Sequence, residues 1–597
     1  MLVWGPLATG STQLSQFLVL LGLGLLMCAF WVMRVWIRQQ YRVLFPPFAW
    51  TVLVFIGYAI WRYSWVDYEY GARLEILQII LYGLLFFAIL DNLTSSEHIQ
   101  IILFTLLGLG VLNAFYGIFQ YFTDSRHVLW FPKPAAYRGR GTGTFICPNH
   151  LAGFLEMLLP IALAYTVTAR YKHLTKVFLG YAALAIAAGI GVTLSRGGYL
   201  AVAASLVVFF ALLLWNRNFR LPAIGLMTLL LVTSAFFGVR SWQAEKRFAD
   251  AKHYNMRLLY WKPAVEMWKE NFWFGVGPQH YDWRLRKWRH WQLQGRPIYV
   301  HNDYLNTVAE YGTTGGIIVG AALLTLAWSV LRTWKYVRRS NEISTRTSNR
   351  SAVVLGCSVG LLAIVLHSVT DFNLHIPGNA VVAVTLMAIV ISHMRYATER
   401  FWVKPGIIGR LLLTVTILGG VGYLGLQMSK LVPQTYLLAK FFKPHTWEER
   451  LDLLKKAHVI EPGNSEVAME IGIQLRKKAF EGDEGWENVT REAIPWFEKG
   501  GALNKWNPFV YTNLGASYDW LGEHEKAAPY FEKAREMDPN GHYVLFWYAW
   551  HKLQVGELAE ARKFFLDSYN FNHLDNEDAK NYVQIVDRML AERAQTQ

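Results

Sequence analysis

A histidine at the end of a basic, tryptophan-rich stretch is the residue of this sequence best suited to acid–base chemistry. His301 stands in the segment H-N-D-Y-L-N, so Asn302 and Asp303 follow it directly. An imidazole titrates near neutral pH and can take a proton from an attacking hydroxyl group. We therefore predict a catalytic role for His301, with Asn302 and Asp303 as supporting groups that orient it or its acceptor.

Arginines in two glycine-containing segments offer positive charge to an anionic ligand. Arg196 lies in S-R-G-G between two apolar stretches, where a guanidinium is costly unless it faces water or an anion. Arg138 and Arg140 lead through R-G-R-G-T-G-T-F-I-C-P-N-H toward a helix expected to begin near Pro148. Glycine lets a backbone come close to a ligand, and a helix N-terminus favours anions. Because the segment lacks the G-K-[ST] of a nucleotide loop, it does not predict nucleotide binding.

The stretch from residue 241 to residue 300 is unusually basic and aromatic. It holds 11 Lys and Arg against 5 Asp and Glu. Its seven tryptophans are Trp242, Trp261, Trp268, Trp273, Trp283, Trp288 and Trp291. Arginine forks bind phosphate oxygens and aromatic faces stack on sugars, which suits a site for an anionic sugar carrier. An amphipathic helix anchored at the membrane interface by its tryptophans is an equally good interpretation, and the two are compatible.

Several other polar or sulfur-containing residues are expected to have no direct chemical role. Helix packing or paired polar groups are expected for His150, Glu156, His367 and Asp371, and a place behind the site for Glu310. The three cysteines, Cys28, Cys147 and Cys357, are far apart and lack metal-ligand spacing. The sequence thus predicts neither a disulfide framework nor a metal site.

Apolar segments that must position these residues fill the first 430 positions. Of 597 residues, 53% are hydrophobic, and the segments are 17 to 23 residues long. Helices of that length cross roughly 30 Å of hydrocarbon. We place them at 16–34, 43–62, 74–90, 99–121, 148–168, 177–195, 198–215, 221–239, 310–332, 351–371, 378–396 and 407–428. The prediction is an all-α, polytopic bundle of about 12 spans over residues 1–430, whose first segment spans the membrane rather than serving as a signal peptide.

Charge separates the bundle from the tail. Residues 431–597 carry 20 Lys and Arg against 26 Asp and Glu, which leaves a net charge of +21 on the preceding part. Basic loops alternate with loops poor in Lys and Arg, as the positive-inside rule demands of a single topology. Both termini, the loop of about 240–309 and the tail are then expected outside. Because the basic residues punctuate apolar segments, the expected partner is a membrane and not nucleic acid.

The tail carries a helical-repeat signature. All eight positions of the tetratricopeptide pattern are matched by Tyr511, Leu514, Gly515, Tyr518, Ala527, Phe531, Ala534 and Pro539. Related residues 34 positions away on either side predict three to four repeats within 431–597. Such arrays form an α-solenoid with a concave surface for peptides or proteins, so a protein partner is expected, although a merely stabilising cap is the alternative.

The order of these motifs resembles the O-antigen ligase and O-antigen polymerase superfamily, which includes bacterial protein O-oligosaccharyltransferases. The resemblance covers roughly residues 138–371. Its motifs are the glycine-rich approach to P-N-H, then S-R-G-G, M-R-L-L-Y-W-K-P-A with G-V-G-P-Q-H-Y, H-N-D-Y-L-N-T-V-A-E-Y-G and H-S-x-x-D-F-N-L-H-I-P. The tetratricopeptide tail is absent from the simplest ligases, so it leaves the acceptor open.

The resemblance implies an enzyme of cell-surface polysaccharide biosynthesis in the bacterial inner membrane, with a fold of the lipid-carrier glycosyltransferase class. It implies metal-independent transfer, without a cofactor, from a polyprenyl-diphosphate-linked glycan on the periplasmic face. Arg196 and Arg257 would hold the diphosphate, and His301 would activate or orient the acceptor hydroxyl. Two arginines can compensate the charge that develops on a departing diphosphate. Direct attack would invert the anomeric carbon.

Alternative functions differ either in the acceptor of the glycan or in the class of protein. Within the class, the acceptor is lipid A core, another lipid-linked repeat unit, or a Ser or Thr of a protein. A transporter or flippase of lipid-linked polysaccharide is less favoured, because the charges gather on one face and the spans show no internal repeat. A tetratricopeptide assembly scaffold would leave Arg196, Arg257 and His301 without a shared role.

Overall fold

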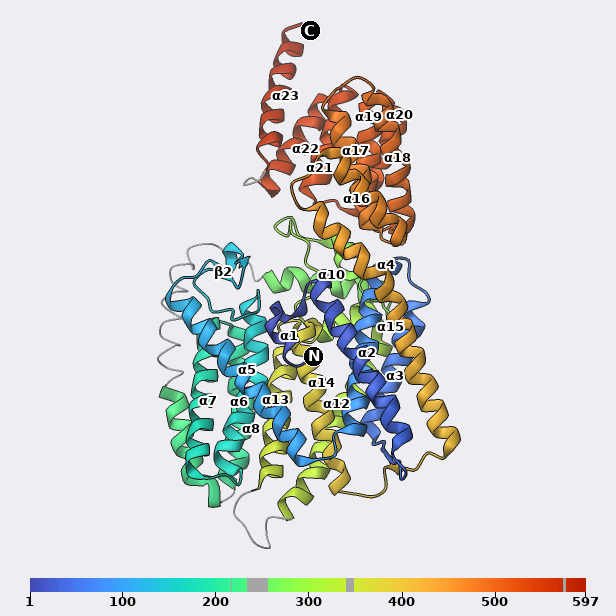
Figure 1. Cartoon of the computed structure of the whole chain (residues 1–597). Coiled ribbons are helices and arrows are strands. Elements are labelled where there is room, and N and C mark those ends of the chain that lie inside the picture. Colours follow the sequence, from blue (N-terminus) through green and yellow to red (C-terminus); the bar gives the residue numbers. More distant parts are fainter. Residues whose placement is uncertain (216, 233–255, 340–347, 573–575, 597) are drawn as a thin grey trace.

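The computed structural model describes residues 1–215, 217–232, 256–339, 348–572 and 576–596. They form a tall helical bundle with a smaller helical domain stacked on one end (Figure 1). Within these residues the strands are limited to two short pairs. β1 (Val43–Leu44) pairs with β4 (Trp402–Val403), and β2 (His127–Val128) pairs with β3 (Phe131–Pro132). The predicted all-α class is confirmed.

Ten helices of the described residues are long and apolar enough to cross a membrane. They are α2 (Leu14–Ile37), α4 (Glu69–Asn92), α5 (Ser96–Phe122), α6 (Pro148–Thr168), α7 (His173–Thr193), α8 (Arg196–Trp215), α12 (Asp303–Arg339), α13 (Asn349–His367), α14 (Pro377–Ser392) and α15 (Ile407–Phe441). The predicted segments 43–62 and 221–239 correspond to shorter helices, α3 (Pro47–Tyr63) and Arg220–Val232. Residues 233–239 of the second segment lie outside the described residues.

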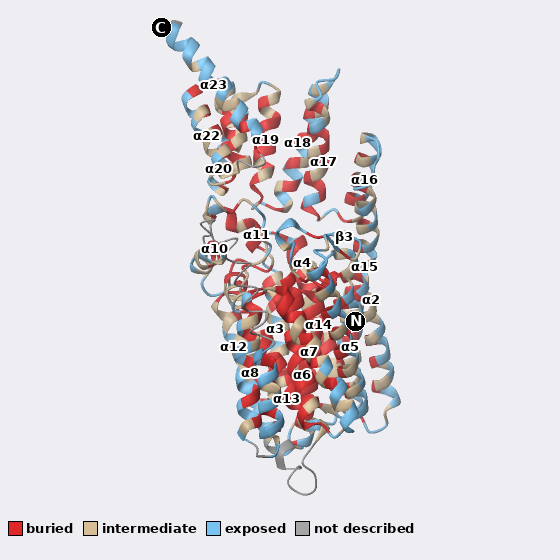
Figure 2. Cartoon of the chain, turned by 90° about the vertical axis from the view of Figure 1, so that its left-hand side faces the viewer, coloured by how far each residue is buried: buried red, intermediate tan, exposed pale blue. Residues whose placement is uncertain are grey.

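Two helices form the centre of the bundle. The most apolar windows of α6 and α14 are 94% and 89% buried, against 11% for α15 at the periphery. Figure 2 shows the buried residues concentrated around α6, α13 and α14. Glycines allow this close packing: a Cβ on Gly360 of α13 would lie 2.2 Å from the carbonyl oxygen of Met157 in α6. The backbones of α6 and α13 therefore touch, which fixes the positions of their ends.

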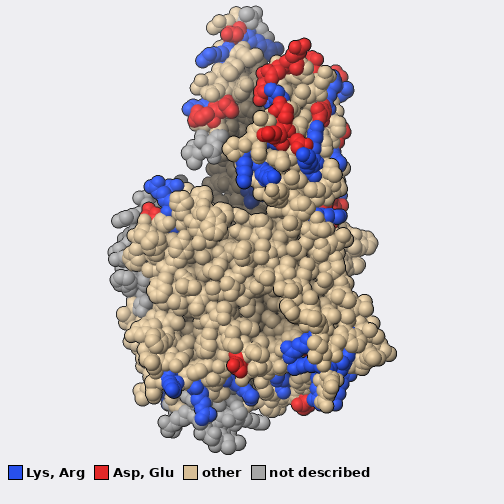
Figure 3. Space-filling model, viewed as in Figure 1, with Lys and Arg blue, Asp and Glu red and all other residues tan. Residues whose placement is uncertain are grey.

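The surface of the bundle is divided by charge along its length. In Figure 3 an uncharged belt covers most of the bundle, and Lys and Arg gather at the end remote from the smaller domain. The β1–β4 pair lies at that remote end and joins the basic segments 38–42 and 399–404. An apolar belt with a basic rim at one end is the distribution expected of a protein that crosses a bilayer.

The tail folds into stacked helical hairpins. Its helices are α16 (Trp447–Ile460), α17 (Ser465–Phe480), α18 (Trp486–Leu503), α19 (Pro508–Trp520), α20 (His524–Met537), α21 (His542–Gln554), α22 (Leu558–Phe571) and α23 (Glu577–Thr596). In successive hairpins Gly472 faces the ring of Phe497 and Gly515 faces the ring of Phe531. The recurrence of this contact confirms the predicted repeats. The expected domain boundary near residue 430 falls inside α15, which runs without interruption from the bundle to the tail.

Candidate functional site

His301 lies at the end of the bundle that carries the repeat domain, just before α12. Its Nδ1 is 3.4 Å from Oδ1 of Asp371, in the loop between α13 and α14. The His301 side chain is 31% exposed, whereas that of Asp371 is 1% exposed. The buried carboxylate thus faces one ring nitrogen of a side chain that is partly exposed.

Two aromatic rings fix the plane of the His301 imidazole. Tyr260 stacks on it with ring centroids 5.0 Å apart and 20° between the planes. Phe372 meets it edge-on at 4.6 Å and 82°. His301 also has a left-handed backbone, with φ of +56°, which a non-glycine residue adopts only where its surroundings impose it. The ring is therefore held in one orientation by contacts on both sides.

Asp371 is kept ionised by its neighbours. Burial raises the pKa of its carboxyl, but the contact with His301 and the nearby histidines outweigh burial, so the pKa is lowered overall. Oδ2 accepts a hydrogen bond of 2.6 Å from Nδ2 of Asn149, at the start of α6. The backbone N–H of Phe372 donates to Oδ1 at 2.9 Å. A charged carboxylate in this position orients His301 and stabilises its protonated form.

Arg140 continues this chain of contacts to the end of α7. Its Nη2 donates to Oδ1 of Asn149 at 3.1 Å. Its Nε donates to the carbonyl of Thr193 at 2.8 Å, and Nη2 also donates to the carbonyl of Leu194 at 3.3 Å. The guanidinium therefore ties the turn before Arg196 to the partner of Asp371. Arg140 thus contacts the backbone at the end of α7. Arg138 is exposed and follows the short η2 helix (Ala135–Tyr137). The supporting roles of both arginines stay predictions.

The glycine-rich approach packs against protein backbone. A Cβ on Gly141 would lie 2.6 Å from the carbonyl oxygen of Gly117 in α5. The N–H of Gly141 donates to the carbonyl of Val192 at 2.8 Å. Gly141 thus lets the backbone of this segment come close to α5 and α7, which brings Arg140 to the end of α7.

Arg196 is the first residue of α8 and is exposed. The next residue, Gly197, packs against the end of α13. A Cβ there would lie 2.5 Å from Oγ1 of Thr370 and 3.0 Å from the ring of His367. The S-R-G-G motif therefore needs its first glycine to bring α8 against α13, and this contact places Arg196 beside the loop that carries Asp371.

Arg257 is the second residue of α10 (Met256–Glu270), one turn before Tyr260. Residues three apart share a helix face, so Arg257 lies on the side of α10 that covers His301. Its charge acts electrostatically on His367, the same residue against which Gly197 packs. The structure thus brings the segments of Arg196, Arg257 and His301 to one end of the bundle.

Asn302 and Asp303 have partners other than His301. Oδ1 of Asn302 accepts a hydrogen bond of 2.9 Å from the N–H of Leu305 and so caps α12. Oδ1 of Asp303 is 2.6 Å from Nδ1 of His375. Both residues support the loop geometry around His301, and the carboxylate at the imidazole is Asp371. For Asp371 the sequence predicts helix packing or a polar pair, and the structure pairs it with His301.

The other buried polar residues pair as well. Nδ1 of His367 is 3.0 Å from Oε2 of Glu156, and both side chains are fully buried. Glu310 accepts hydrogen bonds from the N–H of Tyr281 and from Nδ2 of Asn306, each at 3.0 Å. Glu310 thereby joins α12 to the segment G-V-G-P-Q-H-Y. These contacts hold the framework behind the site.

Basic residues of the 241–300 stretch contact the repeat domain. This stretch includes α11 (Tyr281–Arg284) and the short helix η4 (Leu285–Trp288). Arg284 lies over the ring of Trp506 at 4.0 Å, and Arg286 over that of Phe509 at 4.6 Å. These contacts of Arg284 and Arg286 correspond neither to a site for an anionic sugar carrier nor to an interfacial amphipathic helix, the two interpretations drawn from the sequence. Trp242 lies outside the described residues.

Two protein-family models match parts of the chain. A family model described as O-antigen ligase matches residues 181–320, which include Arg196, Arg257 and His301. A model described as tetratricopeptide repeat matches residues 508–540. None of the curated proteins compared with the chain matches it. Together with the spanning helices, these matches identify the chain as an O-antigen ligase-like, multi-pass membrane protein with a C-terminal tetratricopeptide repeat.

Proposed function

We propose that this protein transfers or polymerises glycan from a polyprenyl-diphosphate-linked donor. The observation that carries the proposal is the pair of His301 and buried Asp371 at one end of the bundle, with Arg196 and Arg257 on neighbouring elements. The match of an O-antigen ligase model to residues 181–320 supports the same class of reaction. The acceptor is a glycan, a lipid or a protein.

His301 is the proposed base. Asp371 faces Nδ1 at 3.4 Å, so a proton on that nitrogen leaves Nε2 to accept one from the acceptor hydroxyl. The hydroxyl oxygen then bonds to the anomeric carbon as the bond from that carbon to the diphosphate oxygen breaks. The bonding electrons leave with the diphosphate, and the anomeric carbon is inverted. The carboxylate of Asp371 stabilises the imidazolium that forms.

Arg196 and Arg257 are the proposed diphosphate ligands. Negative charge grows on the leaving group as its bond to carbon breaks, and fixed guanidinium groups stabilise it most where water is scarce. Two arginines supply this charge compensation without a metal ion. No cofactor is needed for the transfer.

The site is proposed to face the periplasm from the bacterial inner membrane. Lys and Arg gather at the remote end of the bundle, and the positive-inside rule puts that end in the cytoplasm (Figure 3). The repeat domain then lies on the periplasmic side beside the site. A reporter or an accessible cysteine fused at the C-terminus tests this orientation, and a cytoplasmic signal would contradict it.

The enzyme is tested with purified protein, an undecaprenyl-diphosphate-linked oligosaccharide, each class of candidate acceptor in turn, and a chelator in place of metal. We expect release of the carrier and growth of the glycan, both lost in His301→Ala and Arg257→Ala. Matched controls at the remote end are His98→Ala and Arg400→Ala, both exposed, which should behave as the wild type. The length of the product separates polymerisation from single transfer. A donor that is bound but never consumed with any acceptor would contradict the proposed enzyme and favour a transporter.

A further inference from the structure

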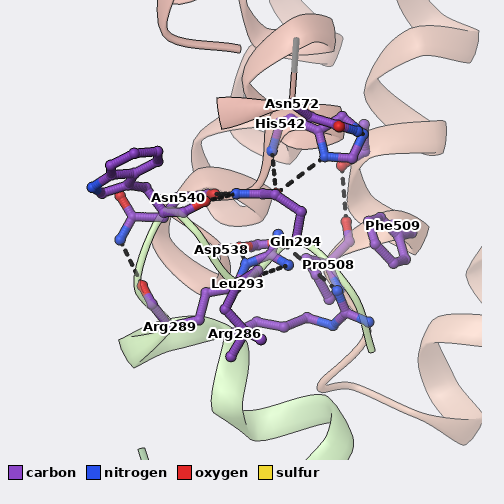
Figure 4. A network of polar contacts seen from close by, with 12 residues as sticks. Arg286, Arg289, Leu293, Gln294, Pro508, Phe509, Asp538, Asn540, His542 and Asn572 are labelled. Atoms are coloured by element: carbon purple, nitrogen blue, oxygen red, sulfur yellow. Dashed lines mark hydrogen bonds and ion pairs between the residues drawn. The ribbon is translucent and has the colours of Figure 1, made fainter. Parts of the chain in front are cut away.

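The repeat domain binds the segment 289–300, which leads into His301, through a buried ion pair. Nε and Nη2 of Arg289 donate to the two oxygens of Asp538, at 2.7 and 2.6 Å, and both side chains are almost fully buried (Figure 4). Asp538 directly follows α20, and Arg289 directly follows η4. A fork-shaped, two-bond contact of this kind fixes orientation as well as distance.

A second set of hydrogen bonds to the repeat domain lies five residues further along the segment, at Gln294. Nε2 of Gln294 donates to the carbonyl of Asn540 at 2.8 Å, and its Oε1 accepts from the N–H of His542 at 3.1 Å. Nδ2 of Asn540 donates to the carbonyl of Arg289 at 2.8 Å. The turn between α20 and α21 therefore binds the main chain of the segment and not only one side chain (Figure 4).

The same segment reaches His301 through a short series of contacts. Arg296 is 2.6 Å from Asp282 and 2.8 Å from Glu466 of the repeat domain. The ring of Tyr299 packs on Phe372 at 5.1 Å, and Phe372 in turn packs on His301. A shift of the segment would therefore move both the chain before His301 and an aromatic contact of its ring.

We propose that the repeat domain positions the catalytic histidine, with Arg289 and Asp538 as the positioning pair. The left-handed backbone of His301 supports this, because such a conformation persists only where contacts hold it. Removing one partner of a buried ion pair leaves the other charge uncompensated, which weakens the contact strongly. The inference rests on the proposed function for its catalytic consequence, but the positioning itself is measurable without activity.

The test compares Asp538→Asn with a control that cuts a different contact between the same two parts. Arg73 and Glu461 form a buried pair at 2.9 Å that does not involve the segment, so Glu461→Gln is the control. Both variants are made in the full-length chain. Hydrogen–deuterium exchange is measured on peptides covering 285–300, and kcat and KM for the lipid-linked donor are measured in the transfer assay.

We expect faster exchange in 285–300 for Asp538→Asn and not for Glu461→Gln. We also expect kcat to fall by about tenfold to a hundredfold, as a displaced catalytic group does, with KM for the donor unchanged. Arg289→Lys keeps the positive charge but loses the two-bond fork of the guanidinium. Its exchange rate in 285–300 and its kcat should lie between those of the wild type and Asp538→Asn.

Two outcomes would overturn the inference. One is unchanged exchange and unchanged kcat in a folded Asp538→Asn variant, and the other is an equal effect of Glu461→Gln on both readouts. A wild type that transfers no glycan while Asp538→Asn still loosens 285–300 would refute the proposed function and leave the positioning intact.

Discussion

Asp371 and His301 lie about 70 positions apart in the sequence, yet Nδ1 of His301 and Oδ1 of Asp371 are 3.4 Å apart. The meeting depends on three elements. The end of α13 brings in Asp371, the start of α12 brings in His301, and α6 adds Asn149 to the carboxylate at 2.6 Å. Because the lowered pKa keeps Asp371 ionised, the imidazole has a permanent negative partner.

The first prediction concerns Asp371→Asn. An amide can orient the imidazole but cannot compensate its positive charge, so we expect transfer to fall by roughly 10²- to 10⁴-fold. Donor binding should persist, because the proposed diphosphate ligands are unchanged. Initial rates and donor binding of the purified variant provide the measurement. Asp67→Asn, an exposed carboxylate that pairs with Lys505, is the control and should keep the wild-type rate.

The second prediction concerns Asn149, the link between Arg140 and Asp371. Asn149→Ala removes a hydrogen bond to a charged group, a loss of about 1.5 kcal/mol that corresponds to roughly tenfold in rate. Asn149→Asp should lower the transfer rate further, because a second carboxylate next to Asp371 would favour protonation of Asp371. The transfer rate is compared with that of Asn92→Ala, whose side chain bonds only within α4. Equal rates for the two Asn149 variants would argue against this electrostatic role.

Much of the fold was predictable because a membrane restricts it. Ten of the twelve apolar segments coincide with helices long enough to span a membrane, since a spanning backbone must satisfy its own hydrogen bonds. The described parts of the other two, 43–62 and 221–239, overlap shorter helices. The repeats were equally clear, because the small and large residues of the signature meet inside each hairpin, as Gly515 and Phe531 do. These features follow from local patterns.

The partners of the site were not predictable in the same way. Asp303 is only two residues from His301 in sequence but faces His375, because neighbouring residues at a helix start point in different directions. Asp371 meets His301 through the packing of α12, α13 and α6, which no local pattern reports. The only signals were the P-N-H and D-F-N-L-H motifs themselves.

The basic stretch shows a related limit. Its composition indicated anion binding, but positive charge does not say which negative group it will meet. Arg289 meets Asp538 of the tail, 249 residues later. The repeat pattern predicts a separate module, so the sequence does not indicate its carboxylates as partners for these arginines.

The third prediction concerns the break in α12 at Gly312. This glycine has φ of +69°, and a Cβ there would lie 2.3 Å from the carbonyl oxygen of Trp273. We expect Gly312→Ala to destabilise the protein by about 1–3 kcal/mol, seen as a lower melting temperature in detergent. Gly320→Ala in the same helix has open space around its Cβ and is the control, with no loss expected.

The last prediction is a pH dependence set by His375 and Asp303. Burial lowers the pKa of His375, but its hydrogen bond to Asp303 and the charges of Asp303 and Glu75 raise it more, so the pKa is raised overall. A histidine with a raised pKa in the folded state stabilises the protein below its unfolded pKa, about 6.5, and loses that contribution as pH rises through the folded value. The wild type should therefore melt at a higher temperature at pH 6 than at pH 8.

His375→Gln should flatten this difference, because glutamine can still donate a hydrogen bond to Asp303 but does not titrate. His98→Gln, an exposed histidine at the remote end, should keep the wild-type pH dependence. If His375→Gln retains the full difference between pH 6 and pH 8, the pair does not control it. Because Asp303 begins α12 two residues after His301, loss of the pair at high pH should also lower the transfer rate of the wild type more than that of His375→Gln.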